Sequence, residues 1–88
     1  MFTVYAIKSM NRNYIYVGLS KNLDRRILEH NLGYNKTTKP YAPFSLIYTE
    51  VFSSRSQARA KEKYLKSGTG KEFLKSLLPS AKNYLSGV

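Results

Sequence analysis

The sequence contains no cysteine and only one histidine, His30. Without cysteine, disulfide cross-links and thiolate metal sites are excluded. A lone histidine excludes the paired histidines of a zinc site, and the chain has neither a glycine-rich phosphate loop nor a defensible Ser-His-Asp arrangement. The chemistry of this chain must therefore come from other residue types.

Long apolar runs are also absent. No stretch approaches the ~18 apolar residues that cross a bilayer, so we expect no membrane partner. The first residues, MFTVY, lack a basic segment followed by a long apolar run, so we expect no secretion signal and a cytoplasmic location. A chain of 88 residues leaves room for one domain. We assign residues 1–80 to that domain and 81–88 to a weakly specified C-terminal tail.

Acidic residues are scarce. Five Asp and Glu stand against fifteen Lys and Arg, which gives a net charge of +10 at pH 7. Such an excess favours a polyanionic partner, with nucleic acid first because binding releases condensed counterions from phosphates. A generally basic, soluble surface is the alternative. Five carboxylates also argue against an acidic cluster that binds two metal ions.

Three segments are predicted to form strands. Residues 2–8 and 14–18 are rich in β-forming residues and flank a turn-prone segment, which predicts an antiparallel hairpin. If this hairpin closes symmetrically about Met10 and Asn11, Tyr5 lies directly opposite Tyr16. Residues 44–52 form the third strand, and apolar residues on both of its faces predict a central position in the sheet.

The first helix is expected directly after the hairpin. Ser20 or Asn22 would cap it, and it would run to about Leu32 and stop at Gly33. The polar, basic segment 34–43 is predicted to be a loop.

Two further helices are expected after the third strand. Ser54 and Gln57 fit a capping box for a helix that stops at Gly68, and a short helix over 71–78 would end at Pro79. The prediction is an α+β fold of order β-β-α-β-α-α, in which helices flank a small three-stranded antiparallel sheet.

His30 falls on the apolar stripe of the first helix, after Leu23 and Ile27. The imidazole thus takes a position usually filled by an aliphatic side chain, and Arg26 precedes it by one turn on the same side. A lone histidine at such a position is more often a hydrogen-bonded core residue than a catalyst. The helix pattern leaves both interpretations open.

Glu62 is the one carboxylate expected on the core side of a helix. An uncompensated buried charge is costly, so Glu62 needs a cation. One interpretation is a salt bridge to Arg26, Lys21 or Lys66. The other is a hard divalent metal held through one carboxylate and several waters, as Mg²⁺ is at phosphate chemistry.

Tyrosine is abundant, with eight in 88 residues, and most are expected in the core or at its rim. Tyr14, Tyr48 and Tyr64 are interpreted in this way. Tyr5 and Tyr16 share a face of the hairpin and form either an ordinary aromatic pair or two hydroxyls aimed into one cleft. In a cleft, phenols bind phosphate or remove a proton from water.

Two short segments, Thr3-Val4-Tyr5 and Tyr16-Val17-Gly18, resemble the signature segments of the GIY-YIG endonuclease superfamily. The first lacks the usual glycine, and the second is close to the consensus. Arg26, eight positions after the second segment, and His30, one turn later, match an arginine and a histidine or tyrosine of that family. Glu62 matches its glutamate in the helix after the third strand. The resemblance spans residues 2 to about 78 and is greatest to small standalone members.

The resemblance implies a metal-dependent DNA endonuclease. Glu62 would hold one Mg²⁺ or Mn²⁺, and Arg26 would neutralise charge on the phosphorus. Tyr5 and Tyr16 would orient or deprotonate the attacking water, and His30 would hydrogen-bond a tyrosine hydroxyl or a phosphate. DNA, duplex or branched, is the expected partner, with RNA as the other candidate.

One departure concerns the residue after the second segment. Some members place a lysine there, whereas this chain has Leu19, which removes one possible activating cation. The resemblance also covers a nuclease domain and little else, so it implies no part that selects a DNA target.

Three interpretations of function follow. Besides an endonuclease, the chain fits a catalytically inactive nucleic-acid-binding module on the same fold, or an RNA-associated protein with a coincidental tyrosine hairpin. A pure binder has no use for Glu62, whose charge repels phosphate, so the endonuclease is favoured. In the endonuclease and in the binding module, cations near the first helix and on the outer side of the second would contact phosphates. They are Lys21, Arg25, Arg55, Arg59, Lys63 and Lys66.

Overall fold

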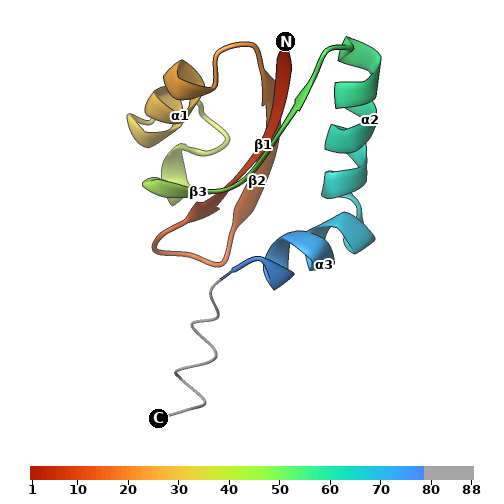
Figure 1. The fold of residues 1–88 in the computed structure, drawn as a ribbon. Helices are drawn as coiled ribbons and strands as arrows, with labels where there is room; N and C mark the ends of the chain where they lie inside the picture. Colours follow the sequence, from red (N-terminus) through yellow and green to blue (C-terminus); the bar gives the residue numbers. More distant parts are fainter. Residues whose placement is uncertain (79–88) are drawn as a thin grey trace.

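The computed structural model describes residues 1–78 and has the predicted α+β order β-β-α-β-α-α. Helix α1 lies on one face of a three-stranded sheet, and α2 and α3 lie on the other (Figure 1). No helix among the described residues is long and apolar enough to span a bilayer. The predicted stop at Pro79 and the tail 81–88 lie outside the described residues. The elements are β1 (Phe2–Ser9), β2 (Ile15–Ser20), α1 (Leu23–Asn31), a 3-10 turn (Lys39–Tyr41), β3 (Phe44–Phe52), α2 (Arg55–Lys66) and α3 (Gly68–Ser76).

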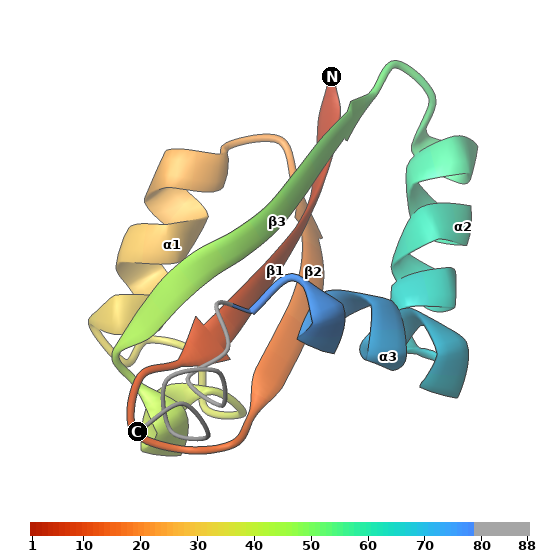
Figure 2. The same ribbon diagram turned by 60° about the horizontal axis from the view of Figure 1, so that its bottom comes forward.

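The sheet order is β2-β1-β3, with both pairs antiparallel, so β1 is the central strand. The prediction of a central position for residues 44–52 is wrong. Strand β3 is apolar on both faces because helices cover both sides of the sheet, as the turned view shows (Figure 2). Ile47 and Tyr48 pack toward α2 and α3, whereas Phe44 packs on the α1 side.

The hairpin register also differs from the prediction. Tyr5 pairs with Gly18 rather than with Tyr16, so the two tyrosines are diagonal neighbours on one face. The cause lies in the turn. The Ser9 amide donates to the carbonyl of Tyr14 at 2.9 Å, and the Ser9 hydroxyl accepts from two loop amides at 3.2 and 3.0 Å. These bonds move the centre of the turn one residue toward the C-terminus.

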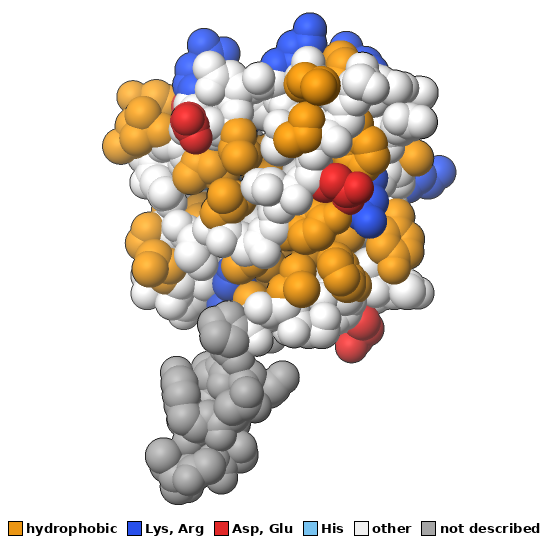
Figure 3. Space-filling view, in the orientation of Figure 1, with side chains coloured by type: hydrophobic (Ala, Val, Ile, Leu, Met, Phe, Trp, Pro, Cys, Tyr) orange, Lys and Arg blue, Asp and Glu red, His pale blue; other side chains and the backbone are white. Residues whose placement is uncertain are grey.

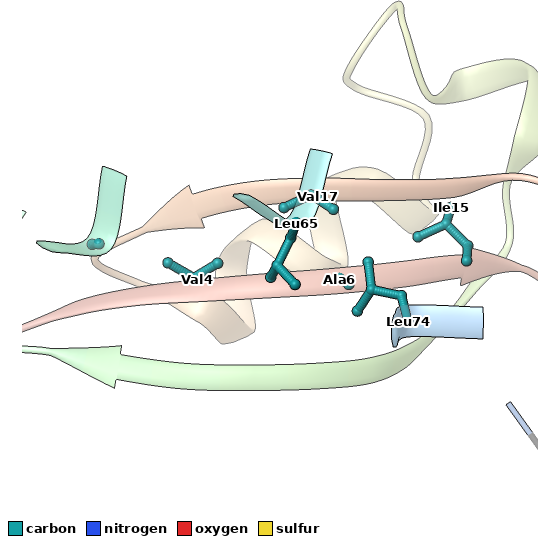
Figure 4. Close-up of a cluster of buried hydrophobic side chains, with 7 residues drawn as sticks. Val4, Ala6, Ile15, Val17, Leu65 and Leu74 are labelled. Atoms are coloured by element: carbon teal, nitrogen blue, oxygen red, sulfur yellow. The ribbon is translucent and has the colours of Figure 1, made fainter. Parts of the chain in front are cut away.

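The larger core lies between the sheet and helices α2 and α3. Alternate residues of β1 and β2 point to this side, as expected for strands. Leu65 and Leu74 point from the two helices toward these strands (Figure 4). The buried residues of this core are Val4, Ala6, Ile15, Val17, Ala58, Leu65 and Leu74.

Helix α3 begins at Gly68, three residues before the predicted start. Ser67 ends α2 and also caps α3, because its hydroxyl accepts from the amide of Gly70 at 3.2 Å. Gly70 lies against the end of α2, where a Cβ would overlap the Tyr64 carbonyl and come within 2.5 Å of Leu65 Cα. The absent side chain therefore allows the two helices to pack at a sharp junction.

The smaller core lies between the sheet and α1, where Tyr5, Ile7 and Phe44 are buried. Asn22 is the N-cap of α1, and its side chain accepts from the backbone amide of Arg25 at 3.1 Å. This core places the tyrosines of the hairpin against the helix that carries the chain's one histidine.

Candidate active site

A cavity of about 380 Å³ opens where the start of β1, the end of β2, α1 and α2 meet. Tyr5, Tyr16, Arg26 and Glu62 are among the residues that line it. Glu62 reaches it from α2 and Arg26 from α1, so helices from opposite faces of the sheet converge at one end of the hairpin. Tyr14, Tyr48 and Tyr64 do not line this cavity.

Tyr5 forms the floor of the cavity and has 0% of its surface exposed. Its hydroxyl shares a hydrogen bond of 2.9 Å with His30 Nε2. Burial, followed by the charge of Tyr16, raises the pKa of Tyr5 to about 12, while the charge and hydrogen bonding of the nearby Arg26 guanidinium oppose the rise. Tyr5 is therefore a protonated phenol at neutral pH.

Gly18 makes room for that phenol. It pairs with Tyr5 across the hairpin, and a Cβ at this position would overlap the Tyr5 hydroxyl and come within 2.5 Å of Tyr5 Cζ. The glycine of the second signature segment is thus required by space rather than by an unusual backbone conformation.

His30 is 1% exposed and is hydrogen-bonded at both ring nitrogens. Besides Tyr5 at Nε2, Thr38 Oγ1 lies 2.9 Å from Nδ1. Burial lowers the pKa of His30, and the charge of Arg26 lowers it further. The ring is therefore neutral at pH 7, and it is both a satisfied core residue and a direct partner of Tyr5.

Arg26 lies near Tyr5 and also pairs with a carboxylate on its own helix, α1. Its Nη1 is 3.3 Å from Glu29 Oε1, and the Arg26 side chain is 42% exposed. Arg25 lies 3.7 Å from the other oxygen of Glu29. In this arrangement, the guanidinium is anchored at the cavity wall by an ion pair that is open to solvent.

Glu62 is 13% exposed, and its carboxylate pairs with Lys66 Nζ at 3.2 Å and Arg59 Nη1 at 3.6 Å. Lys66 was one of the three cations expected from the sequence, and Arg59 was not. Both cations stay more than half exposed, as expected on the outer side of α2, but their tips reach back to Glu62. The other two expected cations, Arg26 and Lys21, line the same cavity.

The donor set suits a hard, partly hydrated metal ion. Within residues 1–78, no group of three or more His, Asp or Glu side chains could hold a metal. Glu62 offers one carboxylate at a cavity open to water, which matches Mg²⁺ or Mn²⁺ bound through one carboxylate, with waters and substrate oxygens completing the shell. The ion would have to compete with Arg59 and Lys66 for that carboxylate.

The predicted phosphate-binding cations divide into two groups. Lys21, Arg55 and Arg59 line the cavity, and Arg25 lines an adjoining hollow of about 360 Å³ that shares Lys21 with it. Lys63 and Lys66 are exposed on α2 and line neither hollow, although Lys66 pairs with Glu62. Lys and Arg side chains gather along the upper rim of Figure 3, where Figure 1 shows the start of β1, the β2–α1 turn and the start of α2.

Sequence reasoning missed Thr38. It lies in the loop predicted at 34–43, eight residues after His30, and is 0% exposed. A single hydroxyl in a polar loop produces no periodic pattern, so the sequence offered no signal for it.

Known families and proteins resemble this chain over most of its length. A family model described as the GIY-YIG catalytic domain matches residues 1–75. The UPF0213 protein SH2523 of Staphylococcus haemolyticus is 37% identical over 75 residues, which cover 84% of this chain and 90% of that protein. The UPF0213 protein CPE1444 of Clostridium perfringens is 35% identical over 72 residues, with 81% and 76% covered.

A solved structure also resembles this chain over most of its length. The solution NMR structure of the UPF0213 protein BH0048 from Bacillus halodurans has 33% sequence identity and a TM-score of 0.54. The match covers 92% of this chain and 89% of that one.

Proposed function

Because this chain belongs to the GIY-YIG catalytic domain family, a superfamily of nucleases, we propose that it is a divalent-metal-dependent endonuclease that hydrolyses phosphodiester bonds of DNA. The observation that carries the proposal is the convergence of Tyr5, Tyr16, Arg26 and Glu62 on one cavity. A cytoplasmic location is part of the same proposal.

Glu62 is the proposed metal ligand. Its carboxylate lines the open cavity and is held in place by cations one turn away on either side. When bound, Mg²⁺ or Mn²⁺ supplies Lewis-acid stabilisation of the scissile phosphate and the leaving oxygen. The carboxylate of Glu62 would hold the ion in the cavity that the two tyrosines line, and substrate phosphates would draw Arg59 and Lys66 away from that carboxylate.

Tyr5 and Tyr16 position the attacking water. Their rings are 6.4 Å apart and both face the cavity. At neutral pH, the Tyr5 hydroxyl is protonated because burial raises its pKa to about 12, so it first acts as a hydrogen-bonding group. The positive charge of the nearby Arg26 already favours loss of that proton, against the larger effect of burial.

Arg26 is the proposed phosphate ligand. Its guanidinium matches two phosphate oxygens, and it would exchange its ion pair with the partly exposed Glu29 for a phosphodiester. Movement of Arg26 onto the substrate would take its guanidinium away from the Tyr5 hydroxyl. The surrounding cations Lys21, Arg25 and Arg55 would hold the neighbouring phosphates.

The test is a plasmid-nicking assay in Mg²⁺ or Mn²⁺, stopped by EDTA and restored by excess metal, over single-stranded, duplex and branched DNA. We expect Glu62→Gln to lower the cleavage rate by about 100-fold or more, the size typical of losing one transition-state-stabilising group. Glu72→Gln is the matched control, because Glu72 lies on α3 and is 78% exposed. Cleavage by Glu62→Gln at the wild-type rate would refute the metal role.

A second candidate is a catalytically inactive binding module. It is favoured by the complete burial of Tyr5 and by the two cations that already neutralise Glu62. Arg26→Ala separates the two: an endonuclease keeps most of its DNA affinity and loses turnover. DNA binding without cleavage in any divalent metal would favour the module.

A further inference from the structure

His30 is held from both sides of its ring, and the second contact comes from a loop that contributes no residue to the cavity. Thr38 Oγ1 lies 2.9 Å from His30 Nδ1, and both residues are buried, at 0% and 1% exposure. A threonine that is fully buried in an otherwise polar and exposed loop needs a specific partner. Here that partner is the only imidazole of the chain.

The loop is folded so that Thr38 points inward. The Asn35 side chain accepts from the backbone amides of Thr37 at 2.9 Å and Thr38 at 3.3 Å, which forms a local turn. The Asn35 carbonyl also accepts from the Lys39 amide at 2.8 Å. Thr37 and Lys39 remain exposed on either side, so the turn delivers one hydroxyl to His30.

The hydrogen bonds around the ring have one consistent direction. Arg26 can only donate to the Tyr5 oxygen, so the buried phenolic hydrogen needs an acceptor of its own. Among the described residues, His30 Nε2 is the partner that the Tyr5 hydroxyl has at 2.9 Å. If Nε2 accepts, the neutral ring carries its hydrogen at Nδ1 and donates it to Thr38.

The Thr38 hydroxyl then donates to the Asn35 carbonyl, 3.5 Å away. In this arrangement, every buried side-chain polar atom of residues 1–78 has a partner. The opposite direction would leave the phenolic hydrogen of Tyr5 with no acceptor, which buried polar groups avoid.

We propose that Thr38 is a positioning residue that holds His30 in the Nδ1–H tautomer, so that Nε2 accepts the hydrogen bond from Tyr5 and the lone pairs of the Tyr5 oxygen face the cavity. The catalytic value of this arrangement rests on the proposed nuclease function, because the lone pairs matter only if Tyr5 orients water. The tautomer itself does not depend on that function.

The tautomer is measured by ¹⁵N NMR of histidine-labelled protein at neutral pH. Since the chain has a single histidine, its two ring nitrogens give an unambiguous pair of signals. We expect a protonated-type signal at Nδ1 and an unprotonated-type signal at Nε2. An Nε2–H tautomer in the wild-type protein would overturn the proposal without any variant.

Three variants then test whether Thr38 sets the tautomer. Thr38→Val keeps the shape but removes the acceptor, and we expect it to redistribute the ring hydrogen toward Nε2. Thr38→Ser keeps the hydroxyl and should restore the wild-type signals. Thr37→Val, at the exposed neighbour in the same loop, is the matched control and should change nothing. A wild-type tautomer in folded Thr38→Val would overturn the proposal.

Cleavage provides the link to function. We expect Thr38→Val to slow single-turnover cleavage by about 10- to 100-fold at unchanged DNA affinity, as for other residues that orient a site histidine, with recovery in Thr38→Ser. If the tautomer follows Thr38 as expected but no protein cleaves in any metal, the positioning by Thr38 is supported and the nuclease function fails.

Discussion

At the scale of single residues, His30 is enclosed by groups that resist its protonation. Burial and the Arg26 charge lower its pKa, and the carboxylate of Glu29 only partly compensates. Protonation would also turn Nε2 into a donor facing the Tyr5 hydroxyl, which would then lose its acceptor. The neutral imidazole is therefore part of the folded structure.

We expect stability to fall in mild acid because of this residue. The unfolded chain has a histidine pKa of about 6.5, and the folded value is lower, so the unfolded state binds more protons between the two. The stabilisation that the neutral His30 ring contributes is complete above about pH 6.5. It is lost as the pH falls from the unfolded-state pKa through the lower folded-state pKa. Urea unfolding from about pH 7.5 to about pH 5 measures it.

His30→Gln is the control, because glutamine does not titrate. The stability of this variant should fall less steeply over the same pH range than that of the wild type. Parallel pH profiles for the two proteins would contradict the assignment.

The residues of the site could be predicted from the sequence only where they belong to a periodic helix or strand pattern. Tyr5, Tyr16 and Glu62 belong to elements with clear periodicity, and the structure brings them to one cavity, although their catalytic roles remain predictions. Thr38 depends on the turn formed by Asn35, whose conformation is fixed by local hydrogen bonds and by burial against α1. No spacing in the sequence encodes that contact.

At the scale of elements, all three strands and all three helices were predicted, but two relations between them were not. Both faces of β3 are apolar because helices pack above and below the sheet. This pattern does not show whether strands lie on both sides of β3, and β3 is in fact an edge strand. The hairpin register depends on the Ser9 hydroxyl, which captures two loop amides and moves the turn. Composition fixes which segments are strands, whereas such local bonds decide how they pair.

The α2–α3 junction provides a test at this scale. We expect Gly70→Ala to lower the free energy of unfolding by about 1–3 kcal/mol, because the new methyl group would overlap the Tyr64 carbonyl. Gly68→Ala is the matched control: nothing lies within 4 Å of its Cβ position, and alanine favours the helix. Urea unfolding should show Gly68→Ala to be neutral or stabilised by up to about 1 kcal/mol. Equal effects of both changes would contradict the packing explanation.

At the scale of the whole molecule, several Lys and Arg side chains gather around the cavity and its neighbouring hollow. Apolar side chains are spread over the face shown in Figure 3, and Lys and Arg side chains are most numerous along its upper rim. That rim contains the cavity and its neighbouring hollow, which Lys21, Arg25 and Arg55 line. A polyanion would therefore meet the end of the molecule that carries the site.

We expect DNA affinity to fall steeply with salt between about 50 and 200 mM, as fluorescence anisotropy would show. Removing two rim cations in Lys21→Ala with Arg55→Ala should reduce the slope of log K against log salt by about 2, one per phosphate contact. Lys36→Ala with Lys75→Ala removes the same charge from exposed positions that do not line either hollow. If both pairs reduce the slope equally, binding depends on total charge and not on the rim.

The complete burial of Tyr5 has a consequence for which substrates the proposed nuclease would cleave. A small phosphodiester can contact few of the cations around the cavity, so its binding would do little to expose the buried phenol. A long strand can contact several of these cations at once, and the free energy of that binding would drive the rearrangement that exposes the phenol. For the proposed nuclease, long and short substrates would then differ in turnover more than in affinity. Phosphodiesters too short to contact several cations would not be cleaved.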